Sequence, residues 1–324
     1  MSSQARSGNN AFAALELDRA SEWREDAAWI DAQACASGAR YLLLDSSGRA
    51  LLGADRRNLR RLCRADCDGL TSAARASFLG SAADDHYFFL RVDGDSAARI
   101  VAETGDEFID LRSAGGSLPA FDAGLFAYAR GLSHWQQQMR FCNACAAPLA
   151  LESGGHRARC TNPQCAIEHF PRTDPAIIAI VEHAGRCLLG RGPKWPERRF
   201  STLAGFVEPG ETLEDAVRRE VFEESGVRVG DCDYHSSQPW PFPASIMLGF
   251  TAQALDPTIR LGNELAEAHW FSVDELVEGL RSRTLGLSSP VSVSYRLIEH
   301  WLRSTAGIEL AQLTDDDPFA FTRS

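Results

Sequence analysis

Residues 205–227, GFVEPGETLEDAVRREVFEESGV, combine the signals of a helix with a cluster of acidic side chains. Thr212, followed three residues later by Asp215, is typical of a helix start, and Gly226 is a typical helix stop. The apolar residues between them recur at helical spacing and would form one buried face. The pattern predicts a helix over residues 212–225.

This helix would carry three carboxylates on one side. Glu220, Glu223 and Glu224 stand at positions i, i+3 and i+4, which span an arc of roughly 100°. Like charges at this spacing destabilise a helix unless a cation lies among them. Oxygen ligands suit Mg²⁺ or Mn²⁺, which keep positions open for water and phosphate oxygens during phosphoanhydride cleavage. On these three acids alone, a solvated acidic helix end paired with Arg218 and Arg219 is the alternative.

The spacing of the whole stretch decides between these interpretations. Gly205, Glu211, the pair Arg219-Glu220, the pair Glu223-Glu224 and Gly226 stand at the positions of the Nudix box. The chain therefore resembles the Nudix hydrolases, which hydrolyse nucleoside diphosphates linked to another group. The resemblance implies an α/β/α sandwich around a mixed sheet and metal binding by Glu220, Glu223 and Glu224. It also implies that Glu211 and Arg219 brace the loop and the helix through an ion pair.

A proline-rich aromatic segment, SQPWPFPAS at residues 237–245, follows the box. Alternating prolines hold a backbone extended and stiff, so Trp240 and Phe242 would be presented rigidly for stacking on a base or a nicotinamide. Gln238 and Ser245 offer hydrogen bonds. By composition alone, the segment could instead be a loop with core aromatics or a ligand for a partner's aromatic groove.

Placed after a Nudix box, this segment resembles the signature of the NADH pyrophosphatase subfamily. That subfamily cleaves NAD(H) to nicotinamide mononucleotide and AMP, and some members remove NAD caps from RNA. The resemblance implies substrate contacts at Gln238, Pro239, Trp240, Pro241, Phe242, Pro243, Ala244, Ser245 and Ser294, with Phe170 and Phe206 as aromatic neighbours. It implies a metal or substrate contact through the backbone of Ala204. It also implies a further metal-binding glutamate, for which we prefer Glu264 over Glu267.

Four cysteines form two pairs at metal-ligand spacing, Cys142 with Cys145 and Cys160 with Cys165. Two such knuckles predict one structural Zn²⁺ per chain, because four cysteines close the coordination sphere. The subfamily also carries a zinc ribbon before its Nudix domain. The second pair is spaced more widely than usual, and Ala146 stands where glycine often follows the first pair. Unliganded thiols are the alternative, and His169 is an alternative ligand.

The rest of the chain is typical of a globular protein. The formal net charge of −11 argues against broad, non-specific nucleic-acid binding. No export signal and no apolar run of membrane-spanning length is visible, so we expect a cytoplasmic protein without a membrane partner. The other five cysteines are expected to be ordinary thiols. A homodimer is expected by resemblance alone.

We predict an α+β domain at residues 1–137, a zinc ribbon at 138–171, a Nudix domain at 172–305 and a tail at 306–324. Strands are predicted at residues 41–44, 50–52, 86–91, 98–101, 176–182 and 186–190. Helices are predicted at 120–139, 272–281 and 293–304, and residues 313–324 are expected to be mobile.

The sequence thus predicts Mg²⁺- or Mn²⁺-dependent hydrolysis of the pyrophosphate of NADH or NAD⁺, free or as a cap on RNA. A Nudix hydrolase of ADP-ribose or other dinucleotides is the first alternative. A non-catalytic zinc-ribbon protein that binds RNA is the second.

Overall fold

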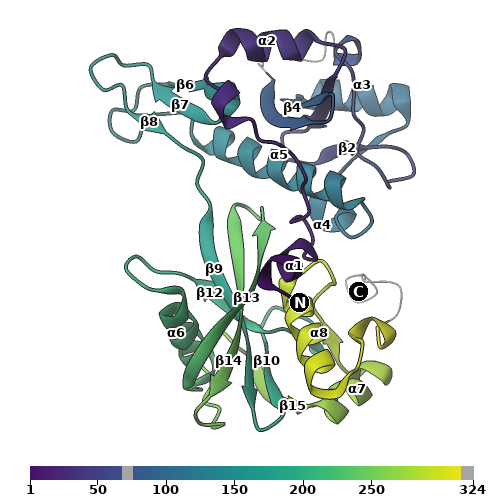
Figure 1. Cartoon of the computed structure of the whole chain (residues 1–324), viewed down its shortest axis with the longest axis vertical. Helices are drawn as coiled ribbons and strands as arrows, with labels where there is room; N and C mark the ends of the chain where they lie inside the picture. The colour runs from purple at the N-terminus through teal and green to yellow at the C-terminus, as the bar shows by residue number, and fades with distance from the viewer. Residues whose placement is uncertain (68–75, 315–324) are drawn as a thin grey trace. The chain divides into compact units, whose positions relative to one another are not determined.

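The computed structural model describes residues 1–67 and 76–314 (Figure 1). The chain folds into two compact units. Unit 1 consists of Met1–Ala13, Asp174–Pro239 and Ser245–Ser324, and unit 2 of Ala14–Thr173 and Trp240–Ala244. The division falls two residues after the predicted start of the Nudix domain, and it assigns two short segments differently from the predicted domains.

Unit 1 is built on a mixed sheet in the order β13-β14-β9-β10-β15, with β12 also paired to β9. Strand β14 runs parallel to β9, whereas β10 and β12 run antiparallel to it. The strands are β9 (Asp174–His183), β10 (Arg186–Arg191), β12 (Leu203–Phe206), β13 (Val229–Trp240), β14 (Ser245–Ala254) and β15 (Glu267–Ser272). A separate pair joins β11 (Arg199–Phe200) and β16 (Gly286–Leu287).

Helices cover both faces of this sheet because β9 is apolar on both sides. Ile177 and Ala179 pack in one core with residues of α6 (Leu213–Ser225). Ile178 and Ile180 pack in another with residues of α7 (Val273–Arg281) and α8 (Val293–Ala306). Figure 1 shows α6 and α8 on opposite sides of the strands. The predicted α/β/α sandwich is confirmed, as are its three predicted helices.

The N-terminal segment Met1–Ala13 also belongs to unit 1. It contains the short helix α1 (Ser3–Gly8) and lies along β13. Asn10 Nδ2 donates to Ser237 O at 2.8 Å, and Gln238 Nε2 donates to Ala11 O at 3.1 Å. We call this segment the N-terminal strap, and nothing in its sequence predicted it.

Unit 2 contains a five-stranded mixed sheet in the order β3-β4-β1-β2-β5. Its strands are β1 (Ala39–Leu44), β2 (Ala50–Leu52), β3 (Ser77–Ala82), β4 (Asp85–Arg91) and β5 (Glu107–Ile109). Its helices are α2 (Ala27–Cys35), α3 (Gly94–Thr104), α4 (Leu111–Ala114) and α5 (Ala120–Gln138). The unit also holds a three-stranded ribbon of β6 (Leu149–Glu152), β7 (Arg157–Cys160) and β8 (Glu168–His169). Short 3₁₀ turns lie at Ser21–Trp23, Ala65–Cys67 and Ser153–Gly155, with a fourth at Leu310–Gln312 in unit 1.

One predicted strand is wrong. Residues 98–101 lie inside helix α3, not in a strand. Asp93 caps this helix by accepting from Ser96 N at 2.8 Å, and Gly105 ends it in the left-handed conformation. The stabilisation from these two helix caps exceeds the preference of Ile100 and Val101 for a strand. The other predicted strands and the helix at 120–139 are confirmed, apart from differences of a few residues at their ends.

No helix within residues 1–67 and 76–314 is long and apolar enough to cross a membrane. The predicted mobile tail lies mostly outside the described residues, which end at Thr314.

Candidate active site and zinc site

Arg219 is the centre of the ion-pair network on α6. Its Nε and Nη2 atoms donate to the two carboxylate oxygens of Glu211 at 2.6 and 2.9 Å. Glu211 also accepts from Glu208 N at 2.9 Å. The hydrogen bond from Arg219 is the largest cause that lowers the pKa of Glu211 to about 2. Glu211 is therefore an anion that braces the loop before α6, as the resemblance implies.

The same guanidinium also reaches two of the predicted metal ligands. Arg219 Nη1 donates to Glu220 Oε1 at 2.9 Å and to Glu223 Oε2 at 3.0 Å. Arg219 Nη2 donates to Phe206 O at 2.8 Å, at the end of β12. The side chain of Glu223 is 57% exposed, so Glu223 lies at the outer edge of the cluster.

Glu220 lies directly against β12, where Gly205 leaves space for it. A Cβ atom on Gly205 would lie 1.9 Å from Glu220 Cδ and 2.0 Å from its Oε1. No side chain fits at this position while the carboxylate stays in place. The glycine of the box is thus required by the approach of a carboxylate to the strand.

Glu224 is a buried carboxylate without a counter-charge. It is 8% exposed, and its Oε2 atom has no hydrogen-bond partner. Burial, followed by the charges of Glu220 and Glu264, raises the pKa of Glu224 to about 8. Burial is also the largest cause that raises the pKa of Glu220. A carboxylate in this position is costly unless a cation neutralises it, so the residues fit a divalent metal.

Glu264 approaches this cluster through a loop that packs on the end of α6. Gly262 N donates to Glu224 O at 2.9 Å, and a Cβ atom on Gly262 would lie 2.1 Å from Glu223 O. The competing residue Glu267 is paired with Arg191, which is the largest cause that lowers the pKa of Glu267. Glu267 thus already has a counter-charge in Arg191, and the choice of Glu264 as the further ligand stays a prediction.

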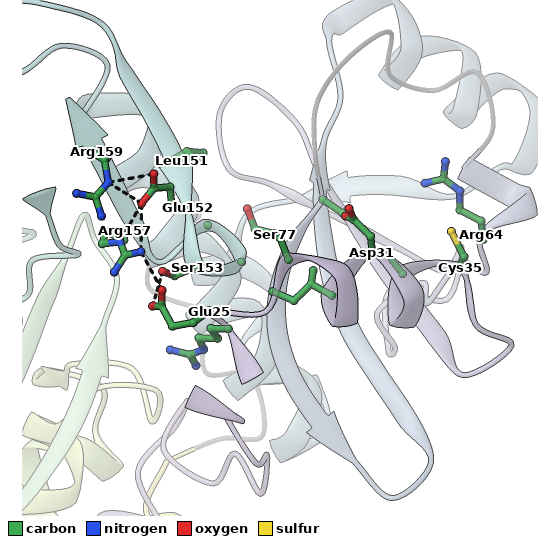
Figure 2. A pocket seen from close by; sticks show the side chains of 17 residues that line it. Glu25, Asp31, Cys35, Arg64, Ser77, Leu151, Glu152, Ser153, Arg157 and Arg159 are labelled. Atoms are coloured by element: carbon green, nitrogen blue, oxygen red, sulfur yellow. Dashed lines mark hydrogen bonds and ion pairs between the residues drawn. The ribbon is translucent and has the colours of Figure 1, made fainter. Parts of the chain in front are cut away.

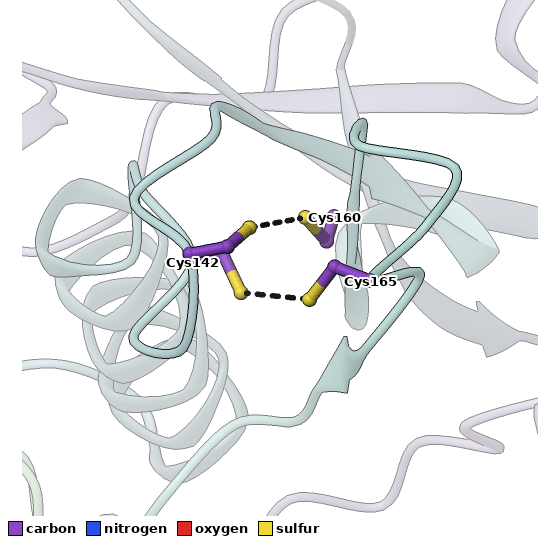
Figure 3. Close-up of side chains that lie close together, drawn as sticks. Cys142, Cys160 and Cys165 are labelled. Atoms are coloured by element: carbon purple, nitrogen blue, oxygen red, sulfur yellow. Dashed lines mark hydrogen bonds between the residues drawn. The ribbon is translucent and has the colours of Figure 1, made fainter.

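The four cysteines lie together in the ribbon (Figure 3). All four sulfur atoms lie within 4.8 Å of one another, with Cys142 Sγ 3.7 Å from Cys165 Sγ and Cys145 Sγ 3.4 Å from Cys160 Sγ. Tetrahedral Zn²⁺ with bonds of about 2.3 Å places its sulfur ligands about 3.8 Å apart. Within the described ranges, no other group of three or more candidate ligands is gathered as closely. The donor set and its spacing fit zinc.

The backbone explains how the knuckles turn without glycine. Ala146 and Ala166 have φ values of 58° and 50°, in the left-handed region. An alanine there costs roughly 1–2 kcal/mol. His169 is not part of the cysteine group; its side chain hydrogen-bonds the Cys142 thiol and is the second cause, after the Ala144 backbone, that lowers the pKa of Cys142.

The aromatic segment Trp240–Ala244 belongs to unit 2, where two arginines contact it. The Trp240 and Phe242 rings lie 5.0 Å apart at 75°. Arg112 Cζ lies 4.0 Å and Arg130 Cζ 5.3 Å from the centre of the Phe242 ring. The sequence did not predict either arginine, because both lie more than a hundred residues before the segment.

The comparisons with known proteins agree with this geometry. Residues 171–287 match the NUDIX domain, and residues 36–135 match the NADH pyrophosphatase-like rudimentary NUDIX domain. The chain is 38% identical to an NAD-capped RNA hydrolase of Chromobacterium violaceum over 69% of this chain and 79% of that protein. It is 36% identical to one of Mycobacterium bovis over 88% and 92% of the two chains.

The chain belongs to the NADH pyrophosphatase subfamily of the Nudix hydrolases. A human NAD-capped RNA hydrolase is 39% identical over 56% of this chain, and the match spans only 42% of that protein. Unit 2 of this Nudix hydrolase therefore holds a rudimentary NUDIX domain, where the sequence alone predicted only an α+β domain.

Several predicted substrate residues of the Nudix hydrolase make structural contacts in unit 1. Gln238 is buried, donates to Val291 O at 2.6 Å and accepts from Val293 N at 2.8 Å. Ser294 Oγ accepts from Thr202 N at 3.1 Å. Their substrate contacts stay predictions.

Four other residues predicted to contact the substrate or the metal lie in or next to strands. Phe170 and Phe206 are 61% and 59% exposed, so both rings are free to meet a ligand. Ser245 opens β14 opposite Asp174, and Ala204 lies in β12 opposite Ile178.

A cavity of about 730 Å³ lies elsewhere, in unit 2 (Figure 2). No residue predicted to bind metal, zinc or substrate lines it. Arg157 and Arg159 at its edge are already paired with Glu25 and Glu152. We therefore do not place the substrate of this Nudix hydrolase there.

Proposed function

We propose that this protein hydrolyses the pyrophosphate bond of NADH and NAD⁺ to nicotinamide mononucleotide and AMP, and that it also removes NAD caps from RNA. One observation supports metal-dependent catalysis. The buried carboxyl group of Glu224 is subject to the negative charges of Glu220 and Glu264, and its Oε2 atom has no hydrogen-bond partner. The relatives described above, which are NAD-capped RNA hydrolases, support the choice of substrate.

Glu220, Glu223, Glu224 and Glu264 would hold Mg²⁺ or Mn²⁺, together with the backbone of Ala204. Such an ion neutralises the pyrophosphate oxygens and lowers the pKa of bound water. Arg219 fixes the positions of Glu211 and Glu220 through its fork of hydrogen bonds. A carboxylate would orient the attacking water and accept its proton as the new bond from oxygen to phosphorus forms. The bridging P–O bond would break at the same time, and the second mononucleotide would leave with the bridging oxygen.

Trp240 and Phe242 would provide flat surfaces on which a base or a nicotinamide stacks. The four cysteines would hold one structural Zn²⁺ and leave no position for water. A homodimer is part of the proposal and rests on the family resemblance alone; sedimentation of the purified chain would test it.

A product assay tests the function directly. NADH, NAD⁺, ADP-ribose and NAD-capped RNA are supplied separately, with and without Mg²⁺ or Mn²⁺. We expect metal-dependent release of nicotinamide mononucleotide and AMP from NADH. Cleavage of ADP-ribose alone would move the protein to another Nudix specificity, and no cleavage of any substrate would favour the non-catalytic alternative.

The variant Glu224→Gln tests the metal site. It keeps the shape of the side chain and removes its charge, so turnover should fall by about 10³-fold or more while the fold survives. Glu214→Gln is the matched control, because Glu214 lies exposed in the first turn of the same helix. Wild-type turnover in Glu224→Gln would contradict the assignment.

A further inference from the structure

The aromatic segment cannot be anchored like an ordinary strand. Pro241 and Pro243 have no N–H group, so alternate residues cannot donate to a neighbouring backbone. The N–H of Phe242 donates within the segment, to Trp240 O at 2.7 Å. Between Pro241 and Pro243, an outside anchor must therefore use carbonyl groups or side chains.

Arg130 on α5 supplies such an anchor. Its Nε atom donates to Pro241 O at 3.0 Å. Its Nη1 atom donates to Gly48 O at 2.9 Å and to Asp110 Oδ2 at 2.9 Å. The guanidinium is therefore held on one side by Gly48 and Asp110 and holds the segment on the other.

Asp110 caps helix α4 and also holds the guanidinium of Arg130. Its Oδ1 atom accepts from Arg112 N at 2.8 Å, at the start of α4, while its Oδ2 atom accepts from Arg130. The guanidinium groups of Arg112 and Arg130 lie within 4.0 and 5.3 Å of the Phe242 ring centre. Contacts of this kind attract the ring through its negative face.

Close packing does not by itself fix the segment here. A cavity of about 100 Å³ is lined by Arg130, His134, Pro241 and Pro243, together with Ser46, Ser47 and Gly48. Because space remains beside the prolines, we expect the hydrogen bond from Arg130 to Pro241 O to contribute to the position of the Phe242 ring.

We propose that Arg130 is a positioning residue for the dinucleotide, acting through Pro241 and Phe242. This inference rests on the proposed function. Arg130 orients the ring on which the substrate stacks and does not take part in the chemical step.

The test is steady-state kinetics with NADH on Arg130→Met, which keeps the length of the side chain and removes its donors. We expect KM to rise about tenfold or more, the effect of one lost hydrogen bond from a charged donor, with kcat within about twofold of wild type. Arg130→Lys should give an intermediate KM, because one ammonium cannot replace the fork. Arg140→Met is the matched control, since Arg140 lies exposed just beyond α5.

A double-mutant cycle separates positioning from general damage. If Arg130 acts through the ring, Arg130→Met should raise KM by no more than about twofold in a Phe242→Ala background. Equal, additive effects in both backgrounds, or an unchanged KM in Arg130→Met, would overturn the inference.

Thermal melting shows whether Arg130→Met folds. If it does not fold, Arg130→Lys is used in its place, and an unchanged KM for NADH in Arg130→Lys would overturn the inference. If wild type and Arg140→Met both fail to cleave NADH, the proposed function fails first. That result is distinct from an active wild type with an ineffective Arg130 substitution.

Discussion

Gly205 shows how closely the candidate active site depends on a missing side chain. The Glu220 carboxylate occupies the place where a Cβ atom would lie. Arg219 holds that carboxylate from the other side, at 2.9 Å. Glu220 therefore has little freedom to move if the space is filled.

We predict that Gly205→Ala lowers NADH turnover by about 100-fold, because a displacement of about 1 Å at a reacting group has effects of that size. Overpacking should also cost about 1–3 kcal/mol of stability. Gly94→Ala is the control, since no atom lies within 4 Å of its added methyl group. Turnover and melting temperature measure both effects, and normal turnover in Gly205→Ala would show that Glu220 can lie elsewhere.

The residues of the candidate site differ in how far the sequence could predict them. Glu220, Glu223 and Glu224 were predictable because one helix fixes their spacing. Glu264 came only from resemblance, since a loop brings it to α6 through the contacts of Gly262. Arg130 was not predictable, because its contact with Pro241 depends on the tertiary fold of unit 2.

Among the elements, the cysteine ribbon is the one that we expect to depend most on a bound ion. Its strands are short, and both knuckles turn through alanines in the left-handed region. Four thiolate bonds to one ion would offset that backbone cost.

We predict that Cys142→Ser lowers the melting temperature clearly while kcat for NADH stays within about twofold, because the zinc closes a fold and does no chemistry. Cys35→Ser is the control, since Cys35 is an exposed thiol at the end of α2. Equal melting temperatures for wild type and Cys142→Ser would argue against the zinc ribbon.

His156 links β3 to the turn before β7 and makes that link sensitive to pH. Its Nε2 atom hydrogen-bonds Phe78 O at 2.8 Å. Burial, followed by the charge of Arg24, lowers the pKa of His156 to about 4. The unfolded chain binds a proton near pH 6.5, and the folded chain resists it until about pH 4.

Stability should therefore be complete above about pH 6.5 and fall as the pH drops towards 4, by roughly 1–3 kcal/mol from this group. Denaturant midpoints at pH 7.5 and 5.0 measure the fall. His156→Gln keeps a donor but cannot ionise, so its stability should change less between the two pH values. Parallel pH profiles for the two proteins would exclude His156 as a source.

Sequence reasoning assigned α3 to the wrong type of element, because its β-branched residues suggested a strand. The pattern of apolar residues over only four positions cannot distinguish a helix from a strand. The caps at Asp93 and Gly105 favour the helix. The long helix α5 and the helices α6 and α8 of unit 1 were predictable because their apolar faces repeat over three turns or more.

For the whole chain, the main departure from a linear order of domains is the N-terminal strap. Asn10 is buried and donates to Ser236 Oγ at 3.1 Å as well as to Ser237 O. No local pattern could predict this, because its partners lie more than 220 residues away.

We predict that Asn10→Ala lowers the stability of unit 1 by about 1–3 kcal/mol, because the buried Ser236 Oγ and the partly buried Ser237 O lose this donor. Asn9→Ala is the control, because the side chain of Asn9 is exposed. We expect this substitution to change the free energy of unfolding by no more than about 0.5 kcal/mol. Denaturant unfolding followed for both proteins measures the difference. If both variants lose the same free energy of unfolding, the hydrogen bonds of Asn10 do not specifically stabilise unit 1.

The division of the chain also affects how it can be made and how it can evolve. Unit 1 takes its first thirteen residues from the start of the chain and the rest from beyond Thr173. A ribosome must therefore release the strap long before β13 exists to receive it. Recombination between genes at the boundary after Thr173 would separate the strap from its strand and Trp240–Ala244 from unit 2. We therefore expect that unit 1 and unit 2 have been inherited together, because an exchange at this boundary would divide both units.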